Sequence, residues 1–159
     1  MSRKNHKLLL CLFRYFLYVY FFCYLLNYKY NFVVVSGTSM EDTYFDHDWS
    51  VVSYDYYKNS APEIGDIICA EILEETDSSI KEVVVIKRIL AEEGDWIEIK
   101  DGQIIINQKT NTDFSSNKYP LSLLKTKLST SQYFIIGDNR DESMYYIISK
   151  EQVLGKVLF

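Results

Sequence analysis

The sequence predicts an all-β domain, mostly antiparallel and coiled into a compact barrel-like body, preceded by one transmembrane helix. Beyond residue 30 the apolar runs are short, rich in Val, Ile and Tyr, and bounded by turn residues, which is typical of strands. Before residue 30 a single long apolar run follows several basic residues, which is typical of a membrane anchor. The 159 residues, of which 48% are hydrophobic, leave room for one domain and a short appendage.

The amino-terminal run LLLCLFRYFLYVYFFCYLL, residues 8–26, is apolar except for Arg14. As a helix it would be roughly 28 Å long, close to the hydrocarbon thickness of a bilayer. The run has no polar face, which argues against a core helix of a soluble domain. No small residues follow it to form a signal cleavage site. We therefore expect residues 1–30 to hold a cytoplasmic amino terminus and a single plasma-membrane span. Residues 31–159 are then predicted to form an extracytoplasmic domain.

The charged and metal-binding residues exclude several classes of protein. The net charge is -5 and the basic residues form no stripe, so we expect no nucleic-acid partner. The chain has three Cys and two His, and these are too scattered for a disulfide framework, a zinc site or a His-based catalytic triad. No metal and no cofactor are therefore expected.

The segments predicted to be strands follow in order along the remaining chain. They are FVVVS (32–36), WSVVSYDYY (49–57), GDIICAEI (65–72), KEVVVIKRI (81–89), DWIEIKDGQIIINQ (95–108), YFIIGDN (133–139) and QVLGKVLF (152–159). Alternation on both sides of Asp101-Gly102 marks a tight hairpin. Residues 108–131 are polar and form the longest connection, in which we expect a helical turn near LSLLKTKL, residues 121–128.

A lysine within an apolar strand, VVVIK at residues 83–87, suggests a catalytic base. Without a usable His or Cys, a hydrolase can activate a serine with a neutral lysine amine. A free lysine has a pKa near 10.4, which burial can lower by up to about 3–5 units. Strand alternation puts Lys87 on one face with Val85, and Arg88 on the other. The alternative is a strand-end lysine whose amine reaches water.

Gly and two hydroxyl residues follow the first predicted strand in SGTSMEDT, residues 36–43. Such clusters usually form turns. The alternative interpretation is that this strand end presents a serine nucleophile near the membrane. A candidate lysine base elsewhere in the chain favours this alternative.

The motifs resemble, in order, the conserved boxes of the type I signal peptidase family. They are SGTSMEDT (36–43), GDIICAE (65–71), IKRILAEEGDWIEIKDGQIIIN (86–107) and FIIGDNRDESM (134–144). The resemblance includes the single anchor and covers nearly all of residues 33–159. It implies a membrane-anchored serine endopeptidase that cleaves signal peptides from exported proteins with a Ser-Lys dyad. Its partners would be signal-peptide-bearing preproteins and the lipid bilayer, while its oligomeric state is not predicted.

By this resemblance, Ser39 matches the family's nucleophile and Lys87 matches its general base. The backbone N–H of Ser39 would help to hold the oxyanion. Some members supply a second donor from a hydroxyl two residues before the nucleophile, where this chain has Gly37. Ser36 and a rearranged backbone are the two alternatives for that donor.

The resemblance also assigns supporting residues. Ser143 matches a hydroxyl that orients the base lysine, and Arg88 and Asp138 match a structural ion pair beside the site. Further residues match positions near the substrate groove, although each could equally be ordinary core: Val35, Met40, Val85 and Ile86.

Two departures from the family pattern bear on activity. The family usually has Pro two residues after Met40, where this chain has Asp42, and a carboxylate within about 4–6 Å would favour a protonated lysine. After GDNRDESM the family has Asp-Ser-Arg, whereas this chain continues with Tyr145 and Tyr146, as if by a short deletion. The alternative function is therefore a degenerate paralogue that binds exported segments without cleaving them. A self-cleaving repressor-type protease would need a DNA-binding module where the anchor lies.

Overall fold

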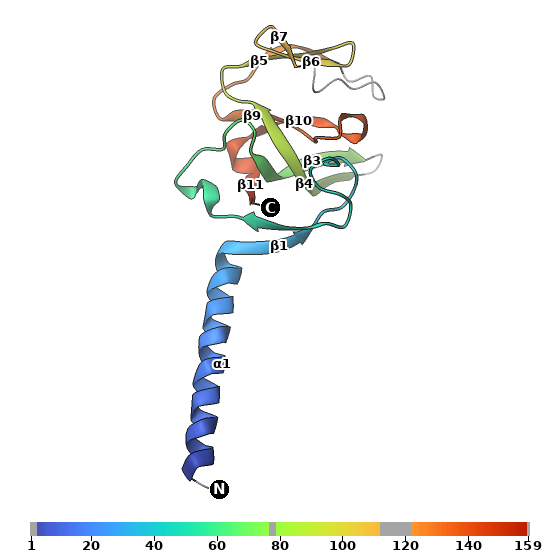
Figure 1. Ribbon diagram of the computed structural model, residues 1–159. Coiled ribbons are helices and arrows are strands. Elements are labelled where there is room, and N and C mark those ends of the chain that lie inside the picture. Colours follow the sequence, from blue (N-terminus) through green and yellow to red (C-terminus); the bar gives the residue numbers. More distant parts are fainter. Residues whose placement is uncertain (1–2, 77–78, 112–121, 159) are drawn as a thin grey trace.

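One long helix precedes a body of β-strands in the computed structural model, which describes residues 3–76, 79–111 and 122–158. The helix α1 (Arg3–Lys29) projects away from the strands, so the amino terminus lies far from the β body (Figure 1). Across the part of the chain that the structure describes, no helix combines the length and the apolar character needed to cross a membrane.

The strands form two antiparallel sheets. The larger has the order β1-β2-β11-β3-β4-β9-β10 and the smaller the order β7-β6-β5-β8. The larger sheet contains β1 (Tyr30–Val34), β2 (Trp49–Ser53), β3 (Ile67–Thr76), β4 (Ser79–Ala91), β9 (Gln132–Ile136), β10 (Tyr145–Ser149) and β11 (Val153–Val157). The smaller contains β5 (Trp96–Lys100), β6 (Gln103–Ile106), β7 (Lys109–Asn111) and β8 (Leu123–Lys127). Short 3-10 helices lie in the connections: η1 (Tyr56–Lys58), η3 (Arg140–Glu142) and η4 (Lys150–Gln152).

The predicted antiparallel β class is confirmed, and so is the hairpin between β5 and β6. Asp101 and Gly102 both have positive φ, 50° and 75°, as a two-residue hairpin turn requires. The helical turn predicted near residues 121–128 is wrong, because Leu123–Lys127 is strand β8 and pairs with β5. Strand β10, which pairs along β9, was not among the predicted strands.

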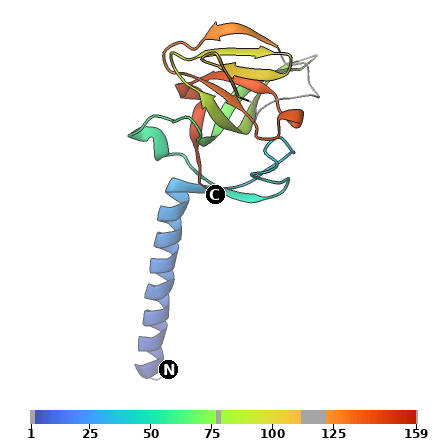
Figure 2. The same ribbon diagram turned by 45° about the horizontal axis from the view of Figure 1, so that its top comes forward.

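The main core lies between the two sheets, at the end of the body away from α1 (Figures 1 and 2). There Phe134 and Ile136 of β9 pack with Ile97 and Ile99 of β5 and with Ile104 of β6. A second cluster covers β3, β4, β9 and β10 and contains Ile68, Ala70, Ile72, Ile89, Tyr133, Ile135 and Ile148. These two clusters fix the buried end of β4 in the middle of the larger sheet.

The strand β4 is paired unequally on its two sides. It pairs with β3 from Ser79 to Arg88, but with β9 only from Arg88 to Ala91. Residues 79–87 therefore have one edge that pairs with no other strand in the described part of the chain. This open edge borders the candidate site.

Candidate active site

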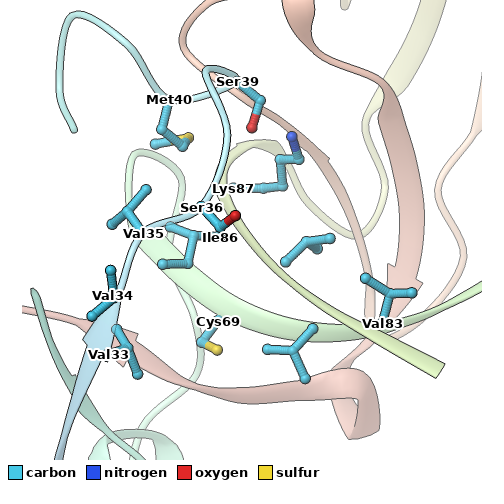
Figure 3. A pocket seen from close by; sticks show the side chains of 12 residues that line it. Val33, Val34, Val35, Ser36, Ser39, Met40, Cys69, Val83, Ile86 and Lys87 are labelled. Atoms are coloured by element: carbon cyan, nitrogen blue, oxygen red, sulfur yellow. The ribbon is translucent and has the colours of Figure 1, made fainter. Parts of the chain in front are cut away.

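A pocket of about 470 Å³ lies between the chain that leaves β1 and the open edge of β4. Residues 33–36, 39 and 40 line one side, and residues 69 and 83–87 line the other. The lining is mostly Val, with Ile, Met and Cys, so the pocket is apolar except at one end. Figure 3 shows the hydroxyl of Ser39 and the amine of Lys87 pointing toward one another at that end.

The amine of Lys87 is held by the hydroxyl of Ser143. Lys87 Nζ donates to Ser143 Oγ over 3.0 Å, and the backbone N–H of Gly137 donates to the same oxygen over 2.7 Å. The Ser143 hydroxyl in turn donates to the carbonyl of Met144 over 3.0 Å. Because both lone pairs of Ser143 Oγ are occupied, this hydroxyl orients Lys87 and cannot take a proton from it. Among the described residues, no hydrogen bond yet joins Lys87 and Ser39, as is common before substrate binds.

Burial lowers the pKa of Lys87 to about 8, because the ammonium loses its hydration. This value includes a smaller lowering by the charge of Arg140 and an opposing effect of Asp138. At pH 7 a group with a pKa of 8 is ~10% neutral, whereas an ordinary lysine is ~0.04% neutral. Only 5% of the surface of Lys87 is exposed, so the alternative of a strand-end lysine whose amine extends into water is wrong.

Arg88 and Asp138 form a bidentate ion pair beside the site. Arg88 Nε and Nη2 donate to the two carboxylate oxygens over 2.7 and 2.6 Å, and Nη1 donates to the carbonyl of Gly65 over 2.8 Å. Thr43 also donates to Asp138, over 2.5 Å. Burial alone would raise the pKa of Asp138, but these hydrogen bonds hold it below its usual value. The carboxylate is thus directed toward Arg88, on the opposite face of β4 from Lys87.

The remaining predicted residues are placed at different depths. Val35 and Met40 are buried against the pocket, and Val85 and Ile86 are half-buried in its wall. Ser36 lines the pocket, and its hydroxyl points into it in Figure 3. Gly37 is not part of the lining.

Gly37 has a φ of 93° and its N–H donates to Asp46 Oδ1 over 2.8 Å. That N–H is therefore already engaged outside the pocket.

Sequence reasoning missed three residues that contact this site: Thr43, Asn139 and Arg140. Asn139 joins the turn that carries Ser39, and Arg140 is buried and influences the pKa of Lys87. The available signal was their position within two motifs: Thr43 ends SGTSMEDT, and Asn139 and Arg140 belong to GDNR after a buried strand. Within the described ranges, no group of three His, Cys, Asp or Glu side chains is placed to hold a metal ion.

The turn at residues 41–42 explains the absence of the family's Pro. Asp42 has a φ of 81°, whereas a proline ring fixes φ near -65°. Glu41 accepts a hydrogen bond from Asn139 Nδ2 over 3.3 Å. Neither acid is among the groups that shift the pKa of Lys87. The turn therefore keeps its negative charge away from the amine.

We predict opposite effects for two substitutions of Asp42. Asp42→Pro should lower the thermal midpoint, with a loss of more than about 1 kcal/mol, because proline cannot adopt this φ. Asp42→Gly should leave stability unchanged or raise it by up to about 1 kcal/mol, since glycine has no penalty there. Thermal unfolding measures both, and Asp42→Ala controls for loss of the charge. A stable Asp42→Pro variant would contradict the left-handed turn.

Comparisons with known proteins point to one family. The family model described as "Signal peptidase, peptidase S26" matches residues 8–159. Signal peptidase I of Bacillus licheniformis is 28% identical over 142 residues, which cover 79% of this chain and 73% of that protein. A crystal structure of a signal peptidase I from Enterococcus faecalis aligns with a TM-score of 0.41 and 22% identity, over 63% of this chain and 98% of that one.

Two plant proteins are also similar. The probable thylakoidal processing peptidase 2 of Arabidopsis thaliana chloroplasts is 35% identical over 96 residues, 58% of this chain and 25% of that protein. Thylakoidal processing peptidase 1 of the same plant is 27% identical over 135 residues, 79% of this chain and 40% of that protein. This chain thus spans less than half the length of either plant relative.

Proposed function

The chain belongs to the signal peptidase family, peptidase S26, and on that premise we propose that it is a serine endopeptidase that removes signal peptides from exported proteins. Ser39 is the nucleophile and Lys87 the general base. The observation that carries the proposal is a buried lysine amine, with a lowered pKa, that faces a serine hydroxyl at the end of an apolar pocket.

In the proposed reaction, neutral Lys87 takes the proton of the Ser39 hydroxyl as Oγ attacks the scissile carbonyl carbon. The protonated amine then donates this proton to the leaving nitrogen as the peptide bond breaks, which leaves an ester on Ser39. Lys87, neutral again, deprotonates the water that hydrolyses the ester. Its hydrogen bond to Ser143 supports this cycle because it directs the amine while the nitrogen lone pair stays available for Ser39.

The oxyanion of the tetrahedral intermediate needs hydrogen-bond donors. We assign the backbone N–H of Ser39 and the hydroxyl of Ser36 to this role. The location of Ser36 in the pocket supports the choice, while the N–H of Gly37 already donates to Asp46. Ser36 would then replace the hydroxyl that some family members carry two residues before the nucleophile.

The substrate is proposed to bind as an extended strand along the open edge of β4. An added strand gains main-chain hydrogen bonds there, and its alternate side chains face the pocket. The wall formed by Val35, Met40, Val85 and Ile86 suits the small apolar side chains that precede a signal cleavage point.

We further propose that residues 1–30 anchor the chain in the plasma membrane, with residues 31–159 outside the cytoplasm. Apolar side chains are exposed all along the described part of α1, from Leu8 to Tyr24. Phe32 and Trp49 are also exposed, on the pair of strands β1 and β2 that follows α1. If the anchor is real, the chain stays in the membrane pellet after alkaline extraction, and release into the supernatant would refute it.

The dyad is tested with purified chain and a peptide that carries an A-x-A site. Ser39→Ala and Lys87→Ala should each reduce kcat by at least ~10³-fold, because neither partner works without the other. Ser36→Ala should cost about 10²-fold in kcat, the usual effect of one oxyanion donor. Lys100→Ala, an exposed lysine on β5 of the smaller sheet, is the matched control and should cleave normally.

No cleavage by the parent chain, together with binding of the peptide, would support the degenerate paralogue instead. Cleavage that survives in Lys87→Ala would reject lysine as the base.

The pH dependence follows from the pKa of Lys87. We expect kcat/KM to rise with pH through about 8, as the amine loses its proton. Arg140→Gln should move this limb to higher pH, because the charge of Arg140 helps to lower the pKa. The pKa in the folded chain lies below the unfolded value, so stability should also rise from about pH 8 to about pH 10.5. A kcat/KM that stays constant as the pH passes through about 8 would contradict the proposal.

A further inference from the structure

The segment 137–139, directly after β9, contacts both halves of the proposed dyad. Its first residue, Gly137, donates its N–H to Ser143 Oγ, the atom that also receives Lys87. Its last residue, Asn139, donates its backbone N–H to the carbonyl of Ser39 over 3.1 Å. The same short segment is therefore bonded to the serine and, through one hydroxyl, to the lysine.

Gly137 packs so closely between the carbonyl of Ser39 and the hydroxyl of Ser143 that no side chain fits at this position. A Cβ added to Gly137 would collide with the carbonyl oxygen of Ser39 and would lie 2.6 Å from Ser143 Oγ. Backbone cannot move aside as a flexible side chain can. The separation between the serine backbone and the hydroxyl that holds the lysine is thus fixed by direct packing.

The side chain of Asn139 forms hydrogen bonds to the turn on both sides of Ser39. Its Nδ2 donates to the carbonyl of Thr38 over 3.0 Å and to Glu41 Oε2 over 3.3 Å. Asn139 is also the N-cap of η3, where Asn usually bonds to the helix with its side chain. Here the side chain makes no such cap bond. It is directed instead across the chain to residues about one hundred positions earlier.

The turn at residues 36–44 has few other attachments. Its remaining hydrogen bonds are internal, apart from Gly37 to Asp46 in the loop that follows. Among described residues, its bonds to distant parts of the chain go only to Arg88, Asp138 and Asn139. Thr43 makes those to Arg88 and Asp138. Asn139 therefore makes the distant hydrogen bonds to residues 38–41, where Met40 is also held by burial of its side chain.

We propose that Asn139 is a positioning residue that sets the location of the Ser39 hydroxyl relative to Lys87. The inference rests on the proposed function and names a part of the same site. Asn139 acts through the serine turn, and none of its hydrogen bonds in the described part of the chain goes to Lys87 or Ser143. Loss of its side chain should therefore reduce kcat while the pH limb of Lys87 stays in place.

The first experiment compares Asn139→Ala with Asn107→Ala. Asn107 is a matched control at the far sheet: its Nδ2 donates to Asp95 over 2.7 Å, and its Oδ1 accepts from the N–H of Trp96 over 3.0 Å. Asn139→Ala should lower kcat about 10- to 100-fold with KM within about 3-fold and the pH limb unmoved. Asn107→Ala should leave kcat unchanged. An equal loss in both variants, or a kcat for Asn139→Ala within about 2-fold of the parent, would overturn the proposal.

The second experiment reverses the polarity of one contact. Asn139→Asp replaces the donor with a carboxylate that faces the Thr38 carbonyl and Glu41, and should lower kcat at least as much as Asn139→Ala. Adding Glu41→Gln restores a donor and acceptor pair and the parent's net charge. The double variant should recover kcat several-fold over Asn139→Asp. No recovery would refute a role for the contact between residues 41 and 139.

Hydrogen exchange separates this inference from the proposed function. In Asn139→Ala, the amides of residues 38–44 should exchange at least ~10-fold faster, while those of β4 stay protected. Unchanged exchange in the turn would disprove the clamp even in an active enzyme. If the parent chain cleaves nothing, the proposed function fails, but exchange still decides whether Asn139 holds the turn.

Discussion

The lysine amine held away from water is the constraint around which this site is built. A lysine pKa of about 8 means that burying the charged form costs on the order of 3 kcal/mol at neutral pH. The rest of the fold must supply that free energy, and the cluster of buried side chains on β3, β4, β9 and β10 contributes to it. Ile68, Ala70 and Ile89 are fully buried there. The proposed base thus depends on a core much larger than the pocket.

Two cations that are adjacent in sequence are kept in different environments by strand geometry. Lys87 faces the pocket end with Ser143, and Arg88 points to the other side of β4, where Asp138 binds it with two hydrogen bonds. If Asp138 faced Lys87 instead, the amine would stay protonated and could not accept a proton. The ion pair therefore serves the proposed chemistry by holding the carboxylate on the arginine side.

The sequence was informative where one strand or one turn carries the signal. The VVVIK run predicted a lysine on an apolar strand, and Asp101-Gly102 predicted a hairpin. The prediction for residues 123–127 was wrong because their mixture of Leu and Lys suits a helical turn as well as a strand. Pairing with β5, which the local sequence does not reveal, makes this segment a strand. The clamp by Asn139 was invisible because its partners lie 98 to 101 positions away.

The short connection after Ser143 shows how the chain supports its site without the family's Asp-Ser-Arg. Tyr145 pairs with Ile136, so strands β9 and β10 close the loop of residues 137–144 at both ends. The ring of Tyr145 stacks on Phe134, with 5.6 Å between centroids, and anchors the start of β10 in the main core. Strand pairing and aromatic packing hold Ser143 opposite Gly137 in this chain. Met144 alone separates Ser143 from β10, and so short a connection has few conformations in which that hydroxyl could turn away from Lys87.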